Sequence, residues 1–348
     1  MPNKQSRMAM SELAASMKVG AVTLPNRVFL APMSGVSDLP FRRRAHEHGA
    51  GLVVSEMIAS EEFCKARRES RQRARGGGLP VRMLQLAGRE ARWMGEAARI
   101  AEAEGADLID INMGCPAKKV TGGYSGSALM RDLDHAMTLI EATVSAVSVP
   151  VTLKMRLGWD ESSINAPVLA RRAVDAGVRM ITVHGRTRAQ LYNGTADWNR
   201  VAAVREAVAA PLVVNGDIEN LEDARRAVAA SGADAVMVGR ASYGQPWLAG
   251  AIARAAGDGR ENIVPGPSGH ALADYVAAHY EDMLSHYGVR TGIRHARKHL
   301  GWYLDRHAPP GPETAGLRGR IMTSNQPEEV IRLIFQALAE PTVAAEAA

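Results

Sequence analysis

The chain has 348 residues, 46% of them hydrophobic and 23% charged, which suits a globular protein with one barrel-sized domain and a smaller one. No apolar run is long enough to cross a bilayer, and no apolar core follows the first basic residues, so neither a membrane span nor a secretory signal is expected. Only two cysteines occur, Cys64 and Cys115, too few for a disulfide framework at this length. We therefore expect a cytoplasmic protein whose thiols are free, with a structural role for Cys64.

The formal net charge of +5 is unevenly distributed along the chain. Residues 288–320 contain seven Lys or Arg residues against two acidic ones, so this segment carries the whole excess and the rest of the chain is balanced. A concentrated basic segment suggests a polyanionic partner.

Short apolar strands alternate with amphipathic helices along most of the chain. The first 16 residues are predicted to be a flexible tail, and residues 17–26 alternate around a glycine and end in Pro-Asn, as a small hairpin would. The strand–turn–helix unit then repeats. The predicted strands are 28–33, 52–55, 81–86, 108–112, 151–155, 180–184, 212–215 and 235–238. The clearest predicted helices are 91–103, 128–145, 166–176, 198–207 and 221–230, and glycine stops several helices before the next strand, at Gly49, Gly105, Gly177 and Gly232.

Eight strand–helix units predict a (β/α)8 TIM barrel within an α/β chain, over residues 17–256. The rival architecture is a doubly wound open sheet, which would place a glycine-rich dinucleotide motif after the first strand, and no such motif follows residue 33. Residues 257–269 (GDGRENIVPGPSG) are expected to be a linker. A smaller all-helical domain is then predicted over 270–340, with a final tail over 341–348.

The helical domain shows patterns at 271–287, 290–307, 313–322 and 327–339. In its second helix, Arg290, Arg294, Arg297 and Lys298 form a basic stripe at helical spacing. A solvated helix face is the ordinary interpretation of such a stripe, but few acidic residues interleave with it here.

The fourth predicted strand ends in an unusual sequence. Asp110 and Asn112 are two residues apart and share one face of the strand, and Gly114 and Pro116 form a turn that presents Cys115. A thiol just beyond the carboxyl end of a parallel strand lies where α/β enzymes carry out their chemistry. The competing interpretation is that Cys115 is a small buried side chain without a chemical role.

The other strands also end in residues typical of an active-site rim. The residues at or just past the eight ends are Pro32, Met33 and Ser34; Ser55, Glu56 and Met57; Gln85; Asn112; Lys154 and Arg156; His184 and Arg186; Asn215, Gly216 and Asp217; and Gly239 and Arg240.

The last two strand ends favour an anion. Glycine lets backbone N–H groups approach a phosphate, and the loops after strands seven and eight of this fold commonly hold one. A flavin mononucleotide (FMN) fits this arrangement, with its phosphate on the two glycine turns and its ring edged by Gln85, Asn112, Lys154 and His184. A cation such as Lys154 would stabilise the reduced anionic flavin. No metal site is predicted.

Motifs across residues 18–339 closely resemble those of the tRNA-dihydrouridine synthases, bacterial B subgroup. The most specific are NMGCPAKKV (112–120) and VHGRTR (183–188). The other matching motifs are APMSGVSD (31–38), QLAG (85–88), GSALMRD (126–132), LKMRLGWD (153–160), NGDI (215–218), MVGRA (237–241) and RHARKHLGWYL (294–304).

The resemblance implies an enzyme that uses FMN, with NADPH as electron source, to reduce the C5–C6 double bond of D-loop uridines in tRNA. It implies that Cys115 is the catalytic acid and that Arg156 faces the flavin or the uracil, as do Asn112 and His184. The implied FMN contacts are Pro32, Met33, Ser34, Gln85, Lys154, Asn215, Gly216, Asp217, Gly239 and Arg240. The residues expected to hold tRNA phosphates are Arg290, Arg294, Arg297, Lys298, Arg318 and Arg320, with a second basic tract over 65–75.

The implied chemistry is consistent with the residues. Hydride delivered from flavin N5 to uracil C6 requires a proton at C5, and a cysteine of ordinary pKa, about 8.5, is mostly a thiol at neutral pH and can donate one. The rival role, nucleophile, would need a depressed pKa. Since no dinucleotide fold is present, NADPH is expected to visit the flavin and leave before tRNA enters. No stable protein partner is implied.

Two other functions remain open on the sequence. One is a flavin-dependent reductase or dehydrogenase of a free pyrimidine, which the basic helical segment disfavours because a free base needs none. The other is an RNA-binding or chaperone protein on an inactive barrel, which Cys115 and Lys154 disfavour.

Overall fold

The computed structural model describes residues 12–339, and the predicted tails fall partly or wholly outside that range. Residues 1–11 of the first tail and all of 341–348 are not described. Within the predicted first tail, Leu13 is buried and its carbonyl accepts a hydrogen bond from the Arg27 N–H at 2.9 Å. This contact anchors residues 12–16 to the folded chain.

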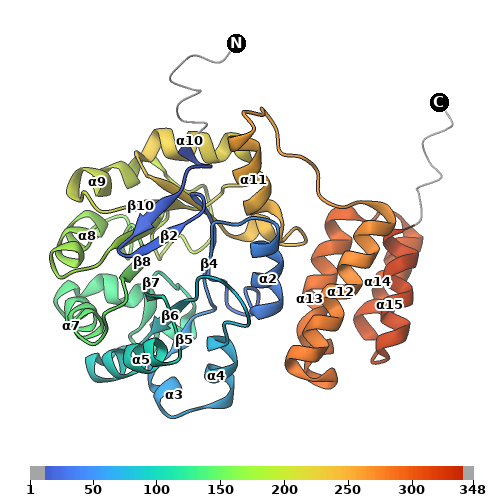
Figure 1. Cartoon of the computed structure of the whole chain (residues 1–348), viewed down its shortest axis with the longest axis horizontal. Coiled ribbons are helices and arrows are strands. Elements are labelled where there is room, and N and C mark those ends of the chain that lie inside the picture. Colours follow the sequence, from blue (N-terminus) through green and yellow to red (C-terminus); the bar gives the residue numbers. More distant parts are fainter. Residues whose placement is uncertain (1–11, 340–348) are drawn as a thin grey trace. The chain divides into compact units, whose positions relative to one another are not determined.

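Eight parallel strands form the barrel, surrounded by helices (Figure 1). They are β3 (Val28–Leu30), β4 (Leu52–Val53), β6 (Met83–Ala87), β7 (Leu108–Met113), β8 (Val151–Arg156), β9 (Met180–His184), β10 (Leu212–Asn215) and β11 (Ala235–Val238). The sheet runs in the order β4-β3-β11-β10-β9-β8-β7-β6, with the two-residue strand β5 (Ile58–Ala59) added beside β6. A parallel bridge between Val54 and Met83 joins β4 to β6 and completes the circle. The predicted (β/α)8 barrel followed by helices is confirmed.

An antiparallel hairpin, β1 (Met17–Val19) and β2 (Val22–Leu24), packs into the barrel from the end where the strands begin. Its buried side chains Met17, Val19 and Leu24 share a hydrophobic cluster with side chains at the starts of the strands, such as Met83 and Leu108. The hairpin therefore fills that end of the barrel, which leaves the carboxyl ends of the strands to form a site.

Helices surround the barrel (Figure 1). Their bounds are α2 (Leu39–Glu47), α3 (Ser60–Cys64), α4 (Arg68–Ala74), α5 (Ala91–Ala103), α6 (Lys118–Thr121), α7 (Leu133–Val144), α8 (Ala166–Asp175), α9 (Asn199–Ala207), α10 (Leu221–Ser231) and α11 (Leu248–Gly257). Two 3₁₀ helices, η1 (Gly126–Arg131) and η2 (Arg240–Ser242), follow β7 and β11. The glycine stops adopt positive φ, for example +108° at Gly177, as left-handed helix ends require.

One predicted helix, 128–145, is divided in the structure. Asp132 has extended backbone angles between η1 and α7, and its side chain accepts from the His135 N–H at 3.0 Å. An aspartate in this position caps the helix that follows it, so α7 begins there.

The remaining helices form a second compact unit, which comprises residues 242–246 and the chain from 265 onward. They are α12 (Gly269–Tyr287), α13 (Val289–His307), α14 (Pro312–Thr323) and α15 (Pro327–Leu338). Within this unit the Tyr243 ring stacks on Trp302 with centroids 4.0 Å apart. No helix in the described part of the chain is long and apolar enough to span a membrane.

Candidate active site

Polar side chains meet where neighbouring barrel strands end. In the sheet register Asn112 on β7 lies opposite Lys154 on β8, while His184 on β9 lies between Arg156 on β8 and Asn215 on β10. These side chains are buried or half-buried. The parallel register therefore brings residues more than 100 positions apart in sequence onto one rim.

A hydrogen-bonded chain of side chains connects β6 and β7. The Asp110 carboxylate accepts from Gln85 Nε2 at 2.7 Å and from Thr152 Oγ1 at 2.5 Å. Asn112 Nδ2 donates to Gln85 Oε1 at 2.7 Å. Burial raises the pKa of Asp110 to about 6, although the two hydrogen bonds and nearby Lys154 oppose the rise. Asp110 is therefore mostly ionised at neutral pH and acts as an acceptor.

Cys115 lies on a turn held from both sides. Asn112 Oδ1 accepts from the backbone N–H groups of Gly114 and Cys115 at 3.2 and 3.0 Å. The carbonyl of Cys115 accepts from Ser127, through its backbone N–H at 3.1 Å and its hydroxyl at 2.9 Å. Burial raises the pKa of the Cys115 thiol, despite the opposing charges of Arg156 and Lys154, so the thiol stays protonated at neutral pH.

Lys154 is a buried cation with spare hydrogen-bonding capacity. Its Nζ donates to Asn215 Oδ1 at 3.0 Å, and Asn215 Nδ2 donates to the Met237 carbonyl at 2.8 Å. The ammonium group has two further N–H donors with no partner among the described residues. Burial, with a contribution from Arg156, lowers the pKa of Lys154 to about 8. The group therefore remains largely charged at neutral pH and can donate to a ligand.

Arg156 is held by three backbone carbonyls. It donates to Gly114 at 2.9 Å, Thr187 at 2.7 Å and Leu191 at 2.8 Å, and the ring of Tyr192 lies 5.5 Å from its guanidinium carbon. Burial lowers its pKa to about 10, so it stays charged. Arg156 thus connects the Cys115 turn to the loop after β9.

His184 is held neutral. Burial lowers its pKa well below the usual value, and Arg156, Lys154, Arg186 and Arg240 add electrostatic repulsion against the charged form. A neutral imidazole offers one donor and one acceptor nitrogen to its surroundings.

Two consecutive residues with positive φ, Gly216 at +117° and Asp217 at +51°, form the turn after β10. A side chain at position 216 would come within 2.8 Å of the His184 ring. Arg186 donates to both oxygens of Asp217, at 2.9 and 2.5 Å, and Arg240 donates at 3.2 Å. Burial opposes ionisation of Asp217, but these arginines and the Ala196 N–H outweigh it and lower its pKa. The turn is therefore rigidly held by ion pairs.

The remaining predicted cofactor residues lie on the loops after β3 and β11. Pro32 and Met33 are half-buried, Ser34 is exposed, and the Met33 N–H donates to Ser37 Oγ at 2.8 Å. Gly239 has open space in front of it, since a side chain there would meet no atom closer than 3.9 Å. The position could therefore accommodate a ligand against its backbone.

Three residues of the site were not assigned a role from the sequence: Asp110, Thr152 and Arg186. Their spacing offered a signal, because Asp110 and Asn112, Thr152 and Lys154, and His184 and Arg186 are each two residues apart on one strand face. Their partners, however, come from other strands and could not be read from the spacing.

The predicted tRNA contacts of the second unit differ in their environments. Arg290 and Arg294 are exposed and have no side-chain partner among the described residues. Arg297 instead donates to the carbonyls of Thr323 and Ser324, at 3.2 and 3.3 Å. Ion pairs with Asp305 and Glu329 hold Arg318 and Arg320, and Lys298 is half-buried.

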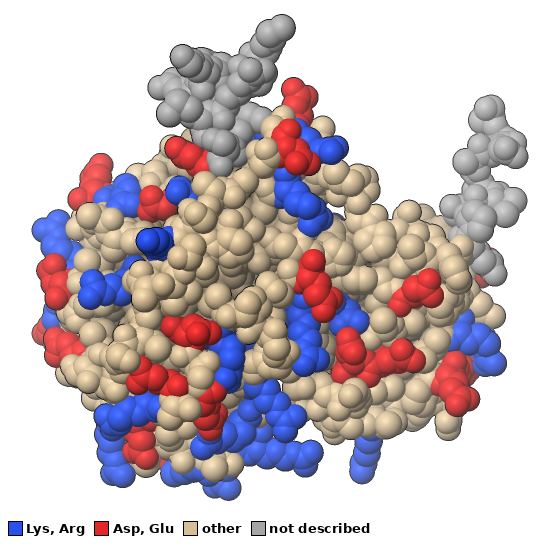
Figure 2. Space-filling view, viewed as in Figure 1, with Lys and Arg blue, Asp and Glu red and all other residues tan. Residues whose placement is uncertain are grey.

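The second basic tract, residues 65–75, comprises the connection between α3 and α4, α4 itself and the residue after it, a region where Figure 2 shows Lys and Arg gathered. Several of its members are paired with glutamates, as in Lys65 with Glu61 at 2.6 Å and Arg73 with Glu69 at 2.6 Å. Arg68 is exposed without an ion-pair partner among the described residues. The tract is thus a mixed surface whose positive charge is partly neutralised.

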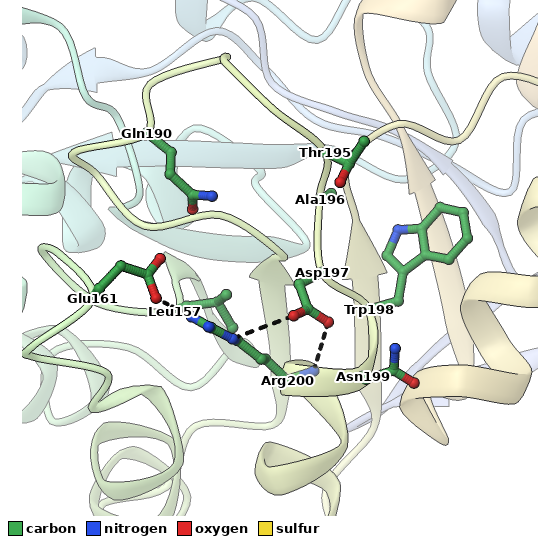
Figure 3. Close-up of a pocket in the computed structure, with 9 residues that line it drawn as sticks. All are labelled: Leu157, Glu161, Gln190, Thr195, Ala196, Asp197, Trp198, Asn199 and Arg200. Atoms are coloured by element: carbon green, nitrogen blue, oxygen red, sulfur yellow. Dashed lines mark hydrogen bonds and ion pairs between the residues drawn. The ribbon is translucent and has the colours of Figure 1, made fainter.

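A separate cavity of about 450 Å³ lies beside the turn after β10. Figure 3 shows Arg200 between Glu161 and Asp197 in its wall. Two residues that line the cavity also contact this turn. The Ala196 N–H donates to the Asp217 carboxylate at 2.7 Å, and Trp198 Nε1 donates to the Gly216 carbonyl at 2.9 Å. None of the predicted site residues lines this cavity. Among the described residues, no group of three or more His, Cys, Asp or Glu side chains is arranged to hold a metal ion.

Comparisons with known proteins agree over nearly the whole chain. The profile of the family described as "Dihydrouridine synthase (Dus)" matches residues 29–341. A "Probable tRNA-dihydrouridine synthase" of Rhizobium leguminosarum bv. phaseoli is 58% identical, covering 91% of this chain and 96% of that protein. A protein of the same description from Rhodobacter capsulatus is 52% identical, covering 93% and 98%. A "tRNA-dihydrouridine synthase B" of Xanthomonas campestris pv. campestris is 43% identical, covering 91% and 94%.

Two solved structures share the fold at low sequence identity. Histamine dehydrogenase from Rhizobium sp. 4-9 has a TM-score of 0.54 and 13% identity, covering 78% of this chain and 51% of that one. Morphinone reductase in complex with tetrahydroNAD has a TM-score of 0.50 and 16% identity, covering 73% and 93%. At these identities the likeness establishes the barrel architecture alone.

Proposed function

This chain belongs to the dihydrouridine synthase family, and we propose that it is an FMN-dependent enzyme that reduces the C5–C6 double bond of D-loop uridines in tRNA, with NADPH as a transient electron donor. The observation that carries the proposal is a protonated, half-buried thiol, Cys115, on the same rim as the buried ammonium of Lys154. A proton donor beside a cation suits the reduction of an electron-poor double bond.

The residues of the rim fit FMN. Lys154 has two unused donors, Gly239 has open space before its backbone, and the site carries four cations, Lys154, Arg156, Arg186 and Arg240. Bound FMN supplies hydride-transfer chemistry. The phosphate would be held by the turn at Gly216 and by Gly239 and Arg240, and the ring by Gln85, Asn112 and Lys154. Pro32, Met33, Ser34, Asn215 and Asp217 would complete the FMN site, with His184 facing the ring.

In the proposed reaction, Cys115 holds the proton destined for C5 of the uracil. Its raised pKa favours this role over that of a nucleophile, because a nucleophilic cysteine needs its thiolate at working pH. Asn112 and Arg156 keep the thiol in place through the two backbone bonds to its turn and the bond to the Gly114 carbonyl. NADPH would visit the flavin and leave before tRNA enters.

A uridine in folded tRNA must leave its stack before it can reach a barrel mouth. The RNA must then be bound elsewhere through its phosphates. Exposed Arg290 and Arg294 are the best placed of the predicted residues, because neither has a side-chain partner among the described residues. Arg297, Lys298, Arg318 and Arg320 would support that surface.

Two measurements test the proposed function. Purified protein should show flavin absorbance, and after reduction by NADPH it should form dihydrouridine in unmodified tRNA while leaving uracil and orotate unchanged. A colourless protein that does not retain riboflavin phosphate would refute the cofactor assignment. Turnover of the free pyrimidines in preference to tRNA would favour the alternative, a reductase of free bases.

A further inference from the structure

A buried carboxylate lies at one end of the hydrogen-bonded chain that leads to Cys115. Asp110 is 2% exposed and accepts from the amide nitrogen of Gln85 at 2.7 Å. The amide oxygen of Gln85 accepts from Asn112 Nδ2 at 2.7 Å, and Asn112 Oδ1 accepts from the Cys115 N–H at 3.0 Å. Four residues are thus linked from the interior of the barrel to the reactive turn.

The hydrogen-bonded chain has a fixed direction because each amide side chain has one donor end and one acceptor end. An ionised carboxylate only accepts, so Asp110 requires the nitrogen of Gln85 to face it, and Gln85 must then present its oxygen to Asn112. Asn112 consequently presents its oxygen to the turn. A buried network of this kind is rigid when every member is satisfied.

The Cys115 end of the hydrogen-bonded chain requires the same orientation of the two amide side chains. The backbone N–H groups of Gly114 and Cys115 are both donors and need an acceptor, which Asn112 Oδ1 supplies at 3.2 and 3.0 Å. With the amide of Asn112 reversed, two donor N–H groups would face an NH₂ group. The two ends therefore select one arrangement of both amides.

We propose that Asp110 is a positioning residue that acts through Gln85 and Asn112 to hold the Cys115 turn, and so keeps the thiol half-buried beside the site. Asp110 is hydrogen-bonded to neither the thiol nor its turn, and its hydrogen bonds reach the turn through the two amides. Lys154 interacts electrostatically with both Asp110 and Cys115, and all of the variants below retain it. The inference deepens the proposed function and rests on it only for the chemical use of the thiol.

Thr152 offers a matched control. Its hydroxyl donates to the other oxygen of Asp110 at 2.5 Å but takes no part in the chain to Cys115. Thr152→Val therefore removes a buried hydrogen bond from the same carboxylate and leaves the direction of both amides unchanged. General loss of stability around Asp110 would affect this variant as well.

A side-chain exchange offers a rescue. In the double variant Asp110→Asn with Gln85→Glu, the new amide nitrogen at 110 can donate to the new carboxylate at 85, which can still accept from Asn112. The oxygen at position 110 can still accept from Thr152. Every hydrogen bond of the chain is thus preserved although its chemical groups are exchanged.

The test is the rate of alkylation of Cys115 by iodoacetamide as a function of pH, in full-length protein as purified, with Cys64 in the same chain as internal reference. Mass spectrometry separates the two sites, and visible absorbance matches the flavin content of the preparations. In Asp110→Leu we expect the thiol pKa to fall and alkylation at neutral pH to rise at least about fivefold, the factor that a hydrogen bond of about 1 kcal/mol represents. Thr152→Val and the double exchange should stay within about twofold of the wild type.

The proposal is overturned if Asp110→Leu leaves the rate unchanged, if Thr152→Val raises it as much, or if the double exchange behaves like Asp110→Leu. Should Asp110→Leu fail to fold, Gln85→Glu alone is compared with the double exchange at alkaline pH, where two ionised carboxylates would face each other and break the chain. Equal alkylation rates in Gln85→Glu and the double exchange would also overturn the proposal. Since alkylation needs neither NADPH nor tRNA, its result is independent of whether the wild type reduces uridine.

Discussion

At the scale of single residues, Cys115 combines a protonated thiol with a rigid turn. Burial raises its pKa, so the thiol remains a proton donor throughout the neutral range. Asn112 and Ser127 fix its backbone through hydrogen bonds of 2.9–3.1 Å. In the proposed mechanism, proton donation by the thiol can therefore be tested apart from flavin reduction, which would not use the thiol.

Cys115→Ala should therefore retain FMN and accept electrons from NADPH at the wild-type rate, but its reduction of uridine in tRNA should be slower by at least about 100-fold, as expected when a general acid is removed. Stopped-flow absorbance measures the first step and dihydrouridine analysis the second. Cys64→Ala is the control, because the Cys64 thiol lies on α3 and donates to the Trp93 carbonyl at 3.8 Å. Full tRNA turnover by Cys115→Ala would remove the thiol from the mechanism.

The buried carboxyl of Asp110 predicts a pH dependence of stability. Its pKa is about 6 in the folded protein against about 3.9 in an unfolded chain, so between these values the folded state binds more protons and the contribution of this group to stability falls as pH rises. Asp110→Asn removes the ionisation. The free energy of unfolding of wild type, relative to that of Asp110→Asn, should fall by about 2 kcal/mol between pH 4 and pH 6.

Denaturant titrations at several pH values measure this difference. Subtracting the free energy of unfolding of the variant cancels the contributions of the other titrating groups, which both proteins share. A difference that stays constant across the range would mean that the folded pKa of Asp110 is not raised.

At the scale of secondary structure, α13 carries arginines in two different environments. Arg297 binds the carbonyls of Thr323 and Ser324 at the end of α14, whose last carbonyls have no partner within the helix. Arg294, one turn away on the same helix, is exposed and has no partner among the described residues. The two positions therefore allow a structural role to be tested separately from the proposed RNA contact.

Arg297→Ala should lower the free energy of unfolding by about 1–2 kcal/mol, because it leaves charge-assisted hydrogen bonds unmade. Arg294→Ala should change stability by less than about 0.5 kcal/mol while weakening tRNA binding. Denaturant unfolding and filter binding of the two variants provide the comparison. Equal loss of stability in both would show that Arg294 is also a structural residue.

Strand positions were the most predictable elements. β9, β10 and β11 occupy the predicted residues, because each is a short apolar run bounded by glycine or polar residues. β3 and β4 are shorter than predicted, ending at Leu30 and Val53. The divided helix at Asp132 and the short helices α3 and α4 were missed, because capping and local turns override the apolar period there.

At the scale of the whole molecule, tRNA binding is predicted to be electrostatic. Each bound phosphate releases counterions from the RNA, so affinity should fall steeply with salt. Replacing both Arg290 and Arg294 with alanine should reduce the slope of log K against log[salt] by about one for each phosphate that the variant no longer binds. Binding isotherms at several salt concentrations measure the slope.

Arg226→Ala is the control for that experiment. Arg226 is a similarly exposed arginine on the barrel helix α10 and pairs with Asp223 at 2.8 Å, so its replacement should leave the slope unchanged. An affinity for tRNA that does not vary with salt would refute phosphate recognition by the helical unit.

The sequence alone determined the barrel, the helical segment after it and the set of polar residues at the strand ends, because these follow from local apolar periods, glycine stops and residue types within a few positions. Family membership likewise followed from short motifs such as NMGCPAKKV. Local patterns could not determine which of these side chains bind one another. Only the closed parallel sheet brought Asp110 to Gln85 and Thr152, Lys154 to Asn215, and Arg186 to Asp217, since each of these contacts joins different strands or the loops that follow them. The tertiary structure likewise decided that Arg297 binds the end of a neighbouring helix while Arg294 stays exposed, because burial depends on what packs against a helix face.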